Sequence, residues 1–146
     1  MTIAETGTPD ALQAALGMVR RLEMDPSGRA RIQYEAARHM CHSGGVVQGG
    51  FVAGWLDTTM AQAAMMLTGA HIVPMTLEMK VSFFEPARPG PVIAEGWVER
   101  AGRATCFAES RLLDPGGVIL AKASATLRLI PRDKVEAASR AAVIAV

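Results

Sequence analysis

The sequence has little of what would tie the protein to nucleic acid, to a metal or to a disulfide framework. Its formal net charge at pH 7 is only +1, and it contains no long run of basic residues that would attract nucleic acid. It has two cysteines, Cys41 and Cys106, and neither belongs to a CxxC motif or to a Cys/His spacing typical of metal ligands. We therefore expect no metal, no cofactor and no nucleic-acid partner.

Aromatic residues are also scarce, but apolar residues are not. Aromatic residues make up 5% of the chain and hydrophobic residues 50%, with nine methionines, so the core must be built mainly from aliphatic side chains and methionine. This composition excludes a disordered chain. A length of 146 residues is near that of one domain. We expect a single domain over 1–146 with its core at about 25–131, and, because 1–9 resemble no signal peptide, a cytoplasmic location.

Charge is almost absent from one long stretch, 44–74, where Asp57 is the only formal charge apart from a histidine. Such a stretch is long enough to span a bilayer. Six glycines and a carboxylate near its middle argue against a membrane span, because an unpaired aspartate is costly in lipid. We expect instead a helix that is buried in protein.

The periodicity of apolar residues predicts the elements around this stretch. Apolar residues at 12, 15, 16 and 19 predict a short helix near the start, and an almost wholly apolar helix is predicted over 49–67, ended by Gly69. Alternation predicts strands at 29–36, 76–84, 92–100, 105–113 and 118–130. In the second of these, Leu77, Met79, Val81 and Phe83 share one face. The tail, 132–146, fits either a short helix or partial disorder.

The connections between the later strands are short, which favours antiparallel pairing. Turns are predicted at 101–103 and 114–117, the second on the sequence Asp-Pro-Gly-Gly. Each strand has an apolar face to bury, and the one apolar helix can bury all of them. The expected fold class is α+β, with an antiparallel sheet wrapped around one long central helix.

The start of the central helix combines two features that suit a catalytic site. The pair Gly49–Gly50 stands where a loop leads into the helix, and free backbone N–H groups at a helix N-terminus stabilise developing negative charge. Asp57 follows two turns later, about 12 Å along the helix axis. On one chain the two are too far apart to act on one carbon, unless the loop curves or two chains pair. A plain turn and a structurally hydrogen-bonded carboxylate are the alternatives.

A family resemblance connects these residues. Their order and spacing resemble the signature of the PaaI-like branch of the hotdog-fold thioesterases, Asn-x-x-Gly-x-x-His-Gly-Gly with an acidic residue eight positions after the first glycine of the pair. The matching positions here are His42, Gly45, Gln48, Gly49, Gly50 and Asp57. The resemblance continues through 79–87, Gly102–Arg103 and 114–123, and so covers about 30–130. It implies a hotdog fold and obligate dimers that often pair into tetramers.

The resemblance also implies a reaction, the hydrolysis of an acyl-CoA thioester at the dimer interface. The Gly49 N–H would polarise the thioester carbonyl, and Asp57 from the other subunit would attack it or activate a water. Thr76 matches the position of a family hydroxyl that orients the water or the carboxylate. Gln48 and His42 replace the family histidine and asparagine, although both can still donate a hydrogen bond.

The rest of the substrate would be held by Gly50 and by cationic side chains near turns. Arg103 and Arg88 are the candidates for the CoA phosphates. The departures at Gln48 and His42 leave open a hotdog protein that binds acyl-CoA without hydrolysing it. A hotdog dehydratase is disfavoured because Asp57 has no histidine at a matching place, and a purely structural oligomeric domain is the remaining alternative.

Overall fold

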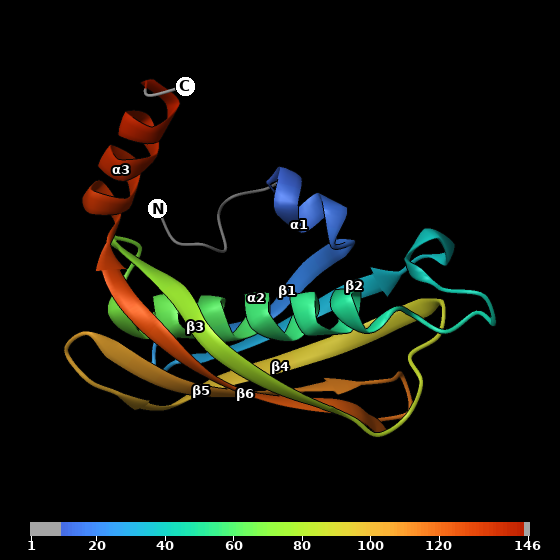
Figure 1. Cartoon of the computed structure of the whole chain (residues 1–146). Helices are drawn as coiled ribbons and strands as arrows, with labels where there is room; N and C mark the ends of the chain where they lie inside the picture. Colours follow the sequence, from blue (N-terminus) through green and yellow to red (C-terminus); the bar gives the residue numbers. More distant parts are fainter. Residues whose placement is uncertain (1–9, 145–146) are drawn as a thin grey trace.

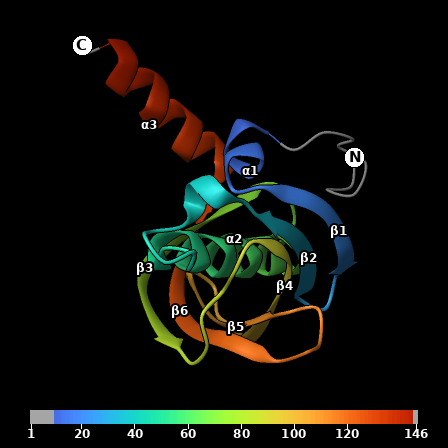
Figure 2. The same ribbon diagram turned by 90° about the vertical axis from the view of Figure 1, so that its right-hand side faces the viewer.

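The computed structural model describes residues 10–144 and consists of a curved antiparallel sheet wrapped around one long helix, α2 (Gly49–Thr68) (Figure 1). The strands are β1 (Met18–Asp25), β2 (Arg29–Ala36), β3 (Ile72–Phe83), β4 (Gly90–Ala101), β5 (Thr105–Leu113) and β6 (Ile119–Pro131). Their order across the sheet is β1-β2-β4-β5-β6-β3. Seen along α2, the sheet surrounds the helix on three sides, with β1 and β3 as its two edges (Figure 2). This is the predicted hotdog fold.

Helix α2 forms the centre of the core, as its uniformly apolar sequence predicted. Trp55, Leu56 and Met60 are fully buried, and each such side chain stabilises the fold by roughly 1.5–3 kcal/mol. The helix lies so close to β4 that a Cβ added at Gly96 would be 2.9 Å from the backbone carbonyl of Thr59. A side chain at Gly96 would therefore push α2 away from the sheet.

The short helix predicted near the start is present, but it ends before the last two apolar positions, 16 and 19, on which it was based. Helix α1 spans only Ala11–Ala15, and the chain then turns at Gly17, whose φ of 75° is accessible to glycine but strained for other residues. From Met18 the chain is an edge strand paired with β2. The apolar spacing was misleading: Leu12 is 61% exposed, whereas Gln13 is buried.

The predicted face of β3 is also only partly correct. Met79 and Val81 pack against the core, but Leu77 is 62% exposed and Phe83, at the end of the strand, is 56% exposed. The register with β6 shifts between Thr76 and Glu78, which marks a β-bulge at Leu77. A bulge inserts one residue and reverses the alternation on one side of it, and the sequence pattern alone does not reveal this.

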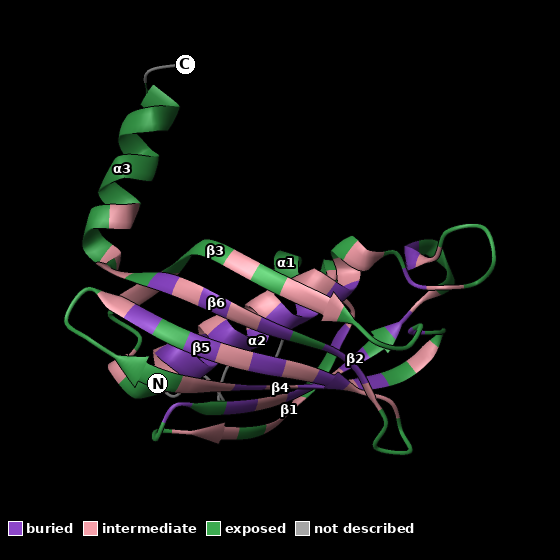
Figure 3. Ribbon diagram, turned by 60° about the horizontal axis from the view of Figure 1, so that its bottom comes forward, coloured by how far each residue is buried: buried purple, intermediate pink, exposed green. Residues whose placement is uncertain are grey.

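The chain ends in helix α3 (Arg132–Ile144), which follows β6 directly. None of its residues is buried, and it projects away from the sheet and α2 (Figure 3). A three-residue 3-10 helix, η2 (Arg38–Met40), precedes the loop that leads into α2. Across the described residues, every helix is too short or too polar to cross a membrane. The expectation about 1–9 lies outside the described residues.

Candidate active site at the start of the central helix

The loop before α2 is held by backbone hydrogen bonds to two other parts of the fold. The Val47 N–H donates to the Ala87 carbonyl at 2.8 Å, and the Gln48 N–H donates to the Met40 carbonyl at 2.9 Å. Gln48 is the N-cap residue of α2, and its Oε1 accepts a hydrogen bond of 2.7 Å from the Gly50 N–H. These contacts fix where the first turn of α2 begins and which way its free N–H groups point.

The Gly49 N–H is free to bind a ligand. It belongs to the first residue of α2, where no intrahelical partner exists, and none of the residues in 10–144 accepts from it. The positive end of the helix dipole adds to its attraction for a polarised oxygen. The Phe83 ring lies against this glycine, since an added Cβ would be 3.2 Å from the Phe83 Cζ. The N–H therefore lies beside an aromatic wall.

Asp57 is half-buried on α2 and is tied to the edge strand β3. The Thr76 hydroxyl donates to the Asp57 Oδ1 at 2.5 Å, while the other carboxylate oxygen has no hydrogen-bond partner among the described residues. The contact expected between Thr76 and the carboxylate is thus present. Asp57 remains about 12 Å along the axis from Gly49, so the structure does not bring these two together within one protomer.

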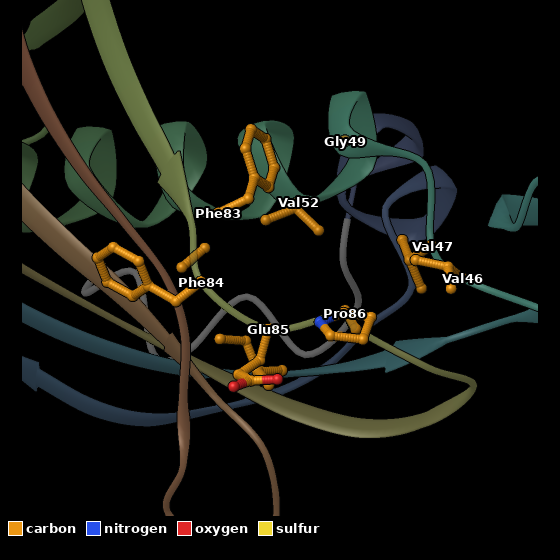
Figure 4. Close-up of a pocket in the computed structure, with 11 residues that line it drawn as sticks. Val46, Val47, Gly49, Val52, Phe83, Phe84, Glu85 and Pro86 are labelled. Atoms are coloured by element: carbon orange, nitrogen blue, oxygen red, sulfur yellow. The ribbon is translucent and has the colours of Figure 1, made fainter.

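A cavity of about 340 Å³ opens beside Gly49, between the start of α2 and the end of β3 (Figure 4). Its walls are mainly apolar, and Glu85 is the one charged residue among the described residues that line it. The lining residues are Val46, Val47, Gly49, Val52, Phe83, Phe84, Glu85, Pro86, Ala87, Leu120 and Ala121. In Figure 4, Glu85 lies on the opposite side from Gly49, with its carboxylate directed away from that glycine.

A second cavity of about 500 Å³ adjoins the first and shares Glu85, Pro86 and Leu120 with it. Arg88 lines this second cavity. The sequence pointed to Arg88 but not to Phe83 or Glu85 as site residues. Their position just before Pro86, at the point where a strand ends facing the glycine pair, was the available signal.

His42 and Arg103 are among the predicted residues that line neither cavity. His42 is exposed, and its Nδ1 lies 3.2 Å from the Ser43 carbonyl oxygen. Arg103 lies in the turn after β4, whereas Arg88 precedes the same strand. The 12 residues of β4 separate the two arginines by about 40 Å, so they do not converge within one protomer.

The remaining titratable groups of the interior do not form an alternative catalytic or metal-binding centre. Burial raises the pKa of the Cys106 thiol, which keeps it protonated and unreactive near neutral pH. Burial likewise raises the pKa of Tyr34 to about 12, against the opposing effect of its hydrogen bond with Thr59. Within 10–144 there is no group of three His, Cys, Asp or Glu side chains that could hold a metal ion.

Comparisons with known proteins agree with this fold. The profile of the thioesterase superfamily matches residues 44–121. A Saccharolobus solfataricus protein described as a candidate esterase is 33% identical over 110 residues, which cover 75% of this chain and 77% of that protein. The chain belongs to the thioesterase superfamily, a family of hydrolases.

Solved structures of similar proteins allow the fold of the chain to be compared directly. A thioesterase-like protein related to phenylacetic acid degradation from Ralstonia eutropha JMP134 is 28% identical, with a TM-score of 0.77, covering 83% of this chain and 91% of that one. The Escherichia coli PaaI protein shares the fold, with a TM-score of 0.76 at 20% identity over 83% of this chain and 85% of that one. The chain therefore shares the hotdog fold of these proteins and is similar to the phenylacetic acid degradation-related members of the superfamily.

Proposed function

We propose that the protein hydrolyses an acyl-CoA thioester to a free acid and CoA at sites formed between two protomers. The single observation that carries this proposal is the Gly49 N–H, which has no acceptor among the described residues and borders an apolar cavity. A free donor at a helix N-terminus suits a carbonyl oxygen that becomes negative as the reaction proceeds. We take the whole chain as one hotdog domain, with its core at about 25–131.

The separation of Gly49 from Asp57 argues for a dimer. Two groups about 12 Å apart on one helix do not reach the same carbonyl carbon. In a two-fold dimer formed edge to edge through β3, the two copies of α2 run antiparallel, so Asp57 of the partner subunit can face Gly49. The β3 edge supports this, because Met75 and Leu77 are exposed on it and, within the described chain, no strand pairs with its outer side. Dimers of dimers remain compatible with this arrangement.

The proposed reaction uses the groups of both protomers. The thioester oxygen accepts a hydrogen bond from the Gly49 N–H, and Asp57 of the partner subunit attacks the carbonyl carbon or removes a proton from a water that attacks it. Collapse of the tetrahedral intermediate breaks the C–S bond, and the CoA sulfur leaves as a thiolate that takes up a proton. After direct attack, water hydrolyses the resulting anhydride. Thr76 holds one carboxylate oxygen and so orients the other.

Gln48 has a defined role in this scheme. Because its Oε1 accepts from the Gly50 N–H, the orientation of the amide is set, and its Nε2 group has no acceptor among the described residues. That group is available as a second donor to the thioester oxygen, where the family has histidine. His42 remains a candidate donor from the exposed loop. Arg88 of one protomer and Arg103 of the partner subunit are candidates for the CoA phosphates. In the proposed dimer, the start of β4 from one protomer and the end of β4 from the other would face the same site.

A protein that binds acyl-CoA without hydrolysing it is the second candidate. The replacement of the family histidine by Gln48, and the exposure of His42, which does not line the cavity, favour it. The cavity and the Gly49 donor would serve both functions equally, so only turnover separates them.

The test is the release of free thiol from a panel of acyl-CoAs by the wild-type protein and by Asp57→Ala. We expect activity in the wild type and a loss of at least about a hundredfold in the variant, because it lacks the reacting carboxylate. Asp133→Ala, on the exposed helix α3, is the matched control and keeps its activity. Wild-type activity no higher than that of Asp57→Ala would contradict hydrolysis, and a rise in melting temperature with CoA would then support the binding function.

A further inference from the structure

We propose that Glu85 makes the protein select acyl groups that carry no negative charge. This inference rests on the proposed function, because it assigns a substrate class to the same site. Glu85 lies two residues after the end of β3 and lines the cavity that begins at Gly49. A carboxylate in the wall of an otherwise apolar cavity would discriminate between acyl groups of equal length and different charge.

The cavity suits the acyl group better than the pantetheine arm of CoA. Pantetheine carries two amides, and a buried amide without a hydrogen-bond partner is costly. Apart from the Gly49 N–H, which would hold the thioester oxygen, the N–H groups nearby are used: Val47 donates to Ala87, and Phe84 and Glu85 both donate to the Leu120 carbonyl. Valine and phenylalanine side chains make up most of the wall near Gly49, so an alkyl or aryl acyl group buries its surface there without such a penalty.

The charge of Glu85 is not neutralised by a neighbour. No cationic side chain within the described residues forms an ion pair with it, and no hydrogen bond to its carboxylate is present. Arg88 lines the adjoining cavity but does not lie within ion-pair distance of Glu85. A second carboxylate at the far end of the acyl group would therefore lie close to a like charge, which weakens its binding even though Glu85 is exposed and partly screened by water.

The experiment compares pentanoyl-CoA with glutaryl-CoA, whose acyl groups have the same chain length and differ by a terminal carboxylate. The measured quantity is the ratio of kcat/KM for the two thioesters. In wild-type protein we expect pentanoyl-CoA to be preferred, and in Glu85→Gln we expect the ratio to shift toward glutaryl-CoA by about tenfold. Glu85→Lys should shift it further. Glu23→Gln, an exposed glutamate on β1, is the control and leaves the ratio unchanged.

The outcomes separate this inference from the function on which it rests. An unchanged ratio in Glu85→Gln overturns the inference, and so does an equal change for both thioesters together with altered inhibition by free CoA, which would place pantetheine in the cavity. The same ratio is also measured as binding affinity in the Asp57→Asn background. If the wild type hydrolyses neither thioester but Glu85→Gln still shifts the affinity ratio, hydrolysis fails and charge selection stands.

Discussion

The two edge strands of the sheet, β1 and β3, differ in length and in the regularity of their pairing. We relate β1 to the stability of the fold and β3 to its function. Strand β1 is 8 residues long, and its pairing with β2 is interrupted by two register shifts. It carries the charged residues Arg20, Arg21 and Glu23, and Arg20 is hydrogen-bonded to Gln33 of the neighbouring strand. Short length, irregular pairing and charge are the features by which proteins prevent an edge strand from pairing with another chain.

The opposite edge, β3, is longer and has a single register shift, although it also carries the exposed charged residues Glu78 and Lys80. It is 12 residues long, and it exposes Leu77 and Met75, the latter 44% exposed. Its single bulge lies at Leu77. A long edge with exposed apolar side chains is suited to pairing with another strand, so the comparison favours β3 over β1 for the dimer contact that we propose.

A side-chain hydrogen bond connects helix α2 to each edge strand, and the two hydrogen bonds differ in their exposure to solvent. On the β3 side, Thr76 donates to Asp57, an interaction that is exposed in the protomer. On the β1 side, the Arg21 Nε donates to the Gln62 Oε1 at 2.9 Å, and Gln62 is only 6% exposed. The first hydrogen bond orients Asp57, which we place in the reaction, and the second satisfies the buried oxygen of Gln62. Substituting residues on each side tests this division.

The largest effect should come from placing charge on the β3 edge. In Met75→Lys combined with Leu77→Lys, we expect the dimer to dissociate and thioester hydrolysis to fall by about a hundredfold, because each site then lacks its partner carboxylate. Light scattering after size exclusion and thiol release measure the two effects. Val19→Lys, on the exposed side of β1, should remain dimeric and active, and a variant of β3 that stays dimeric would contradict the assignment.

A smaller effect is expected at the hydrogen bond between β3 and α2. Thr76→Val keeps the shape of the side chain but removes the hydroxyl that orients Asp57, so kcat should fall by about tenfold with little change in KM. Thr76→Ser retains the hydroxyl and should restore most of the rate. Equal loss of kcat in both variants would mean that the methyl group, and not the hydrogen bond, is what matters.

The smallest effect on activity, with a measurable effect on stability, is expected on the β1 side. Arg21→Met leaves the buried Gln62 oxygen without its donor, which should lower the free energy of unfolding by about 1–3 kcal/mol. Denaturant titration measures this change. Turnover should stay near the wild-type value, and a loss of turnover without a loss of stability would place Arg21 in the site.

Much of the fold could be predicted from the sequence, because the strongest patterns are local. The apolar helix at 49–67, the strand at 105–113 and the Asp-Pro-Gly-Gly turn each depend on composition over a short window. Strand β1 could not be predicted in this way, since an irregular edge strand shows no clear alternation. The bulge at Leu77 also depends on pairing with a strand some 50 residues away.

The residues of the candidate site also fall into two groups, those that were singled out from the sequence and those that only the structure reveals. Gly49, Gln48, Asp57 and Thr76 were found through their spacing and a family resemblance, and the structure adds the contact between the last two. Phe83 and Glu85 were not singled out, because their place in the cavity depends on where the end of β3 meets the start of α2. Sequence reasoning therefore finds residues joined by a motif more readily than residues joined only by the fold.

The claim that Gly49 and Asp57 act from different protomers needs a variant that deletes the Gly49 N–H. Gly49→Pro does so at the first position of a helix, where proline is well tolerated, and the φ and ψ of Gln48, −64° and 136°, are compatible with a following proline. Gly49→Ala adds a Cβ against Phe83 but keeps the N–H, and so serves as the control. We expect Gly49→Pro to lose about a hundredfold or more in kcat, and Gly49→Ala much less.

The most direct measurement is the activity of a heterodimer that combines a Gly49→Pro protomer with an Asp57→Ala protomer, co-expressed with two different affinity tags and isolated through both. Each parent homodimer is inactive, but the heterodimer contains one intact site if the two groups come from different chains. Our account predicts about half of the wild-type activity. A heterodimer no more active than its parents would contradict it.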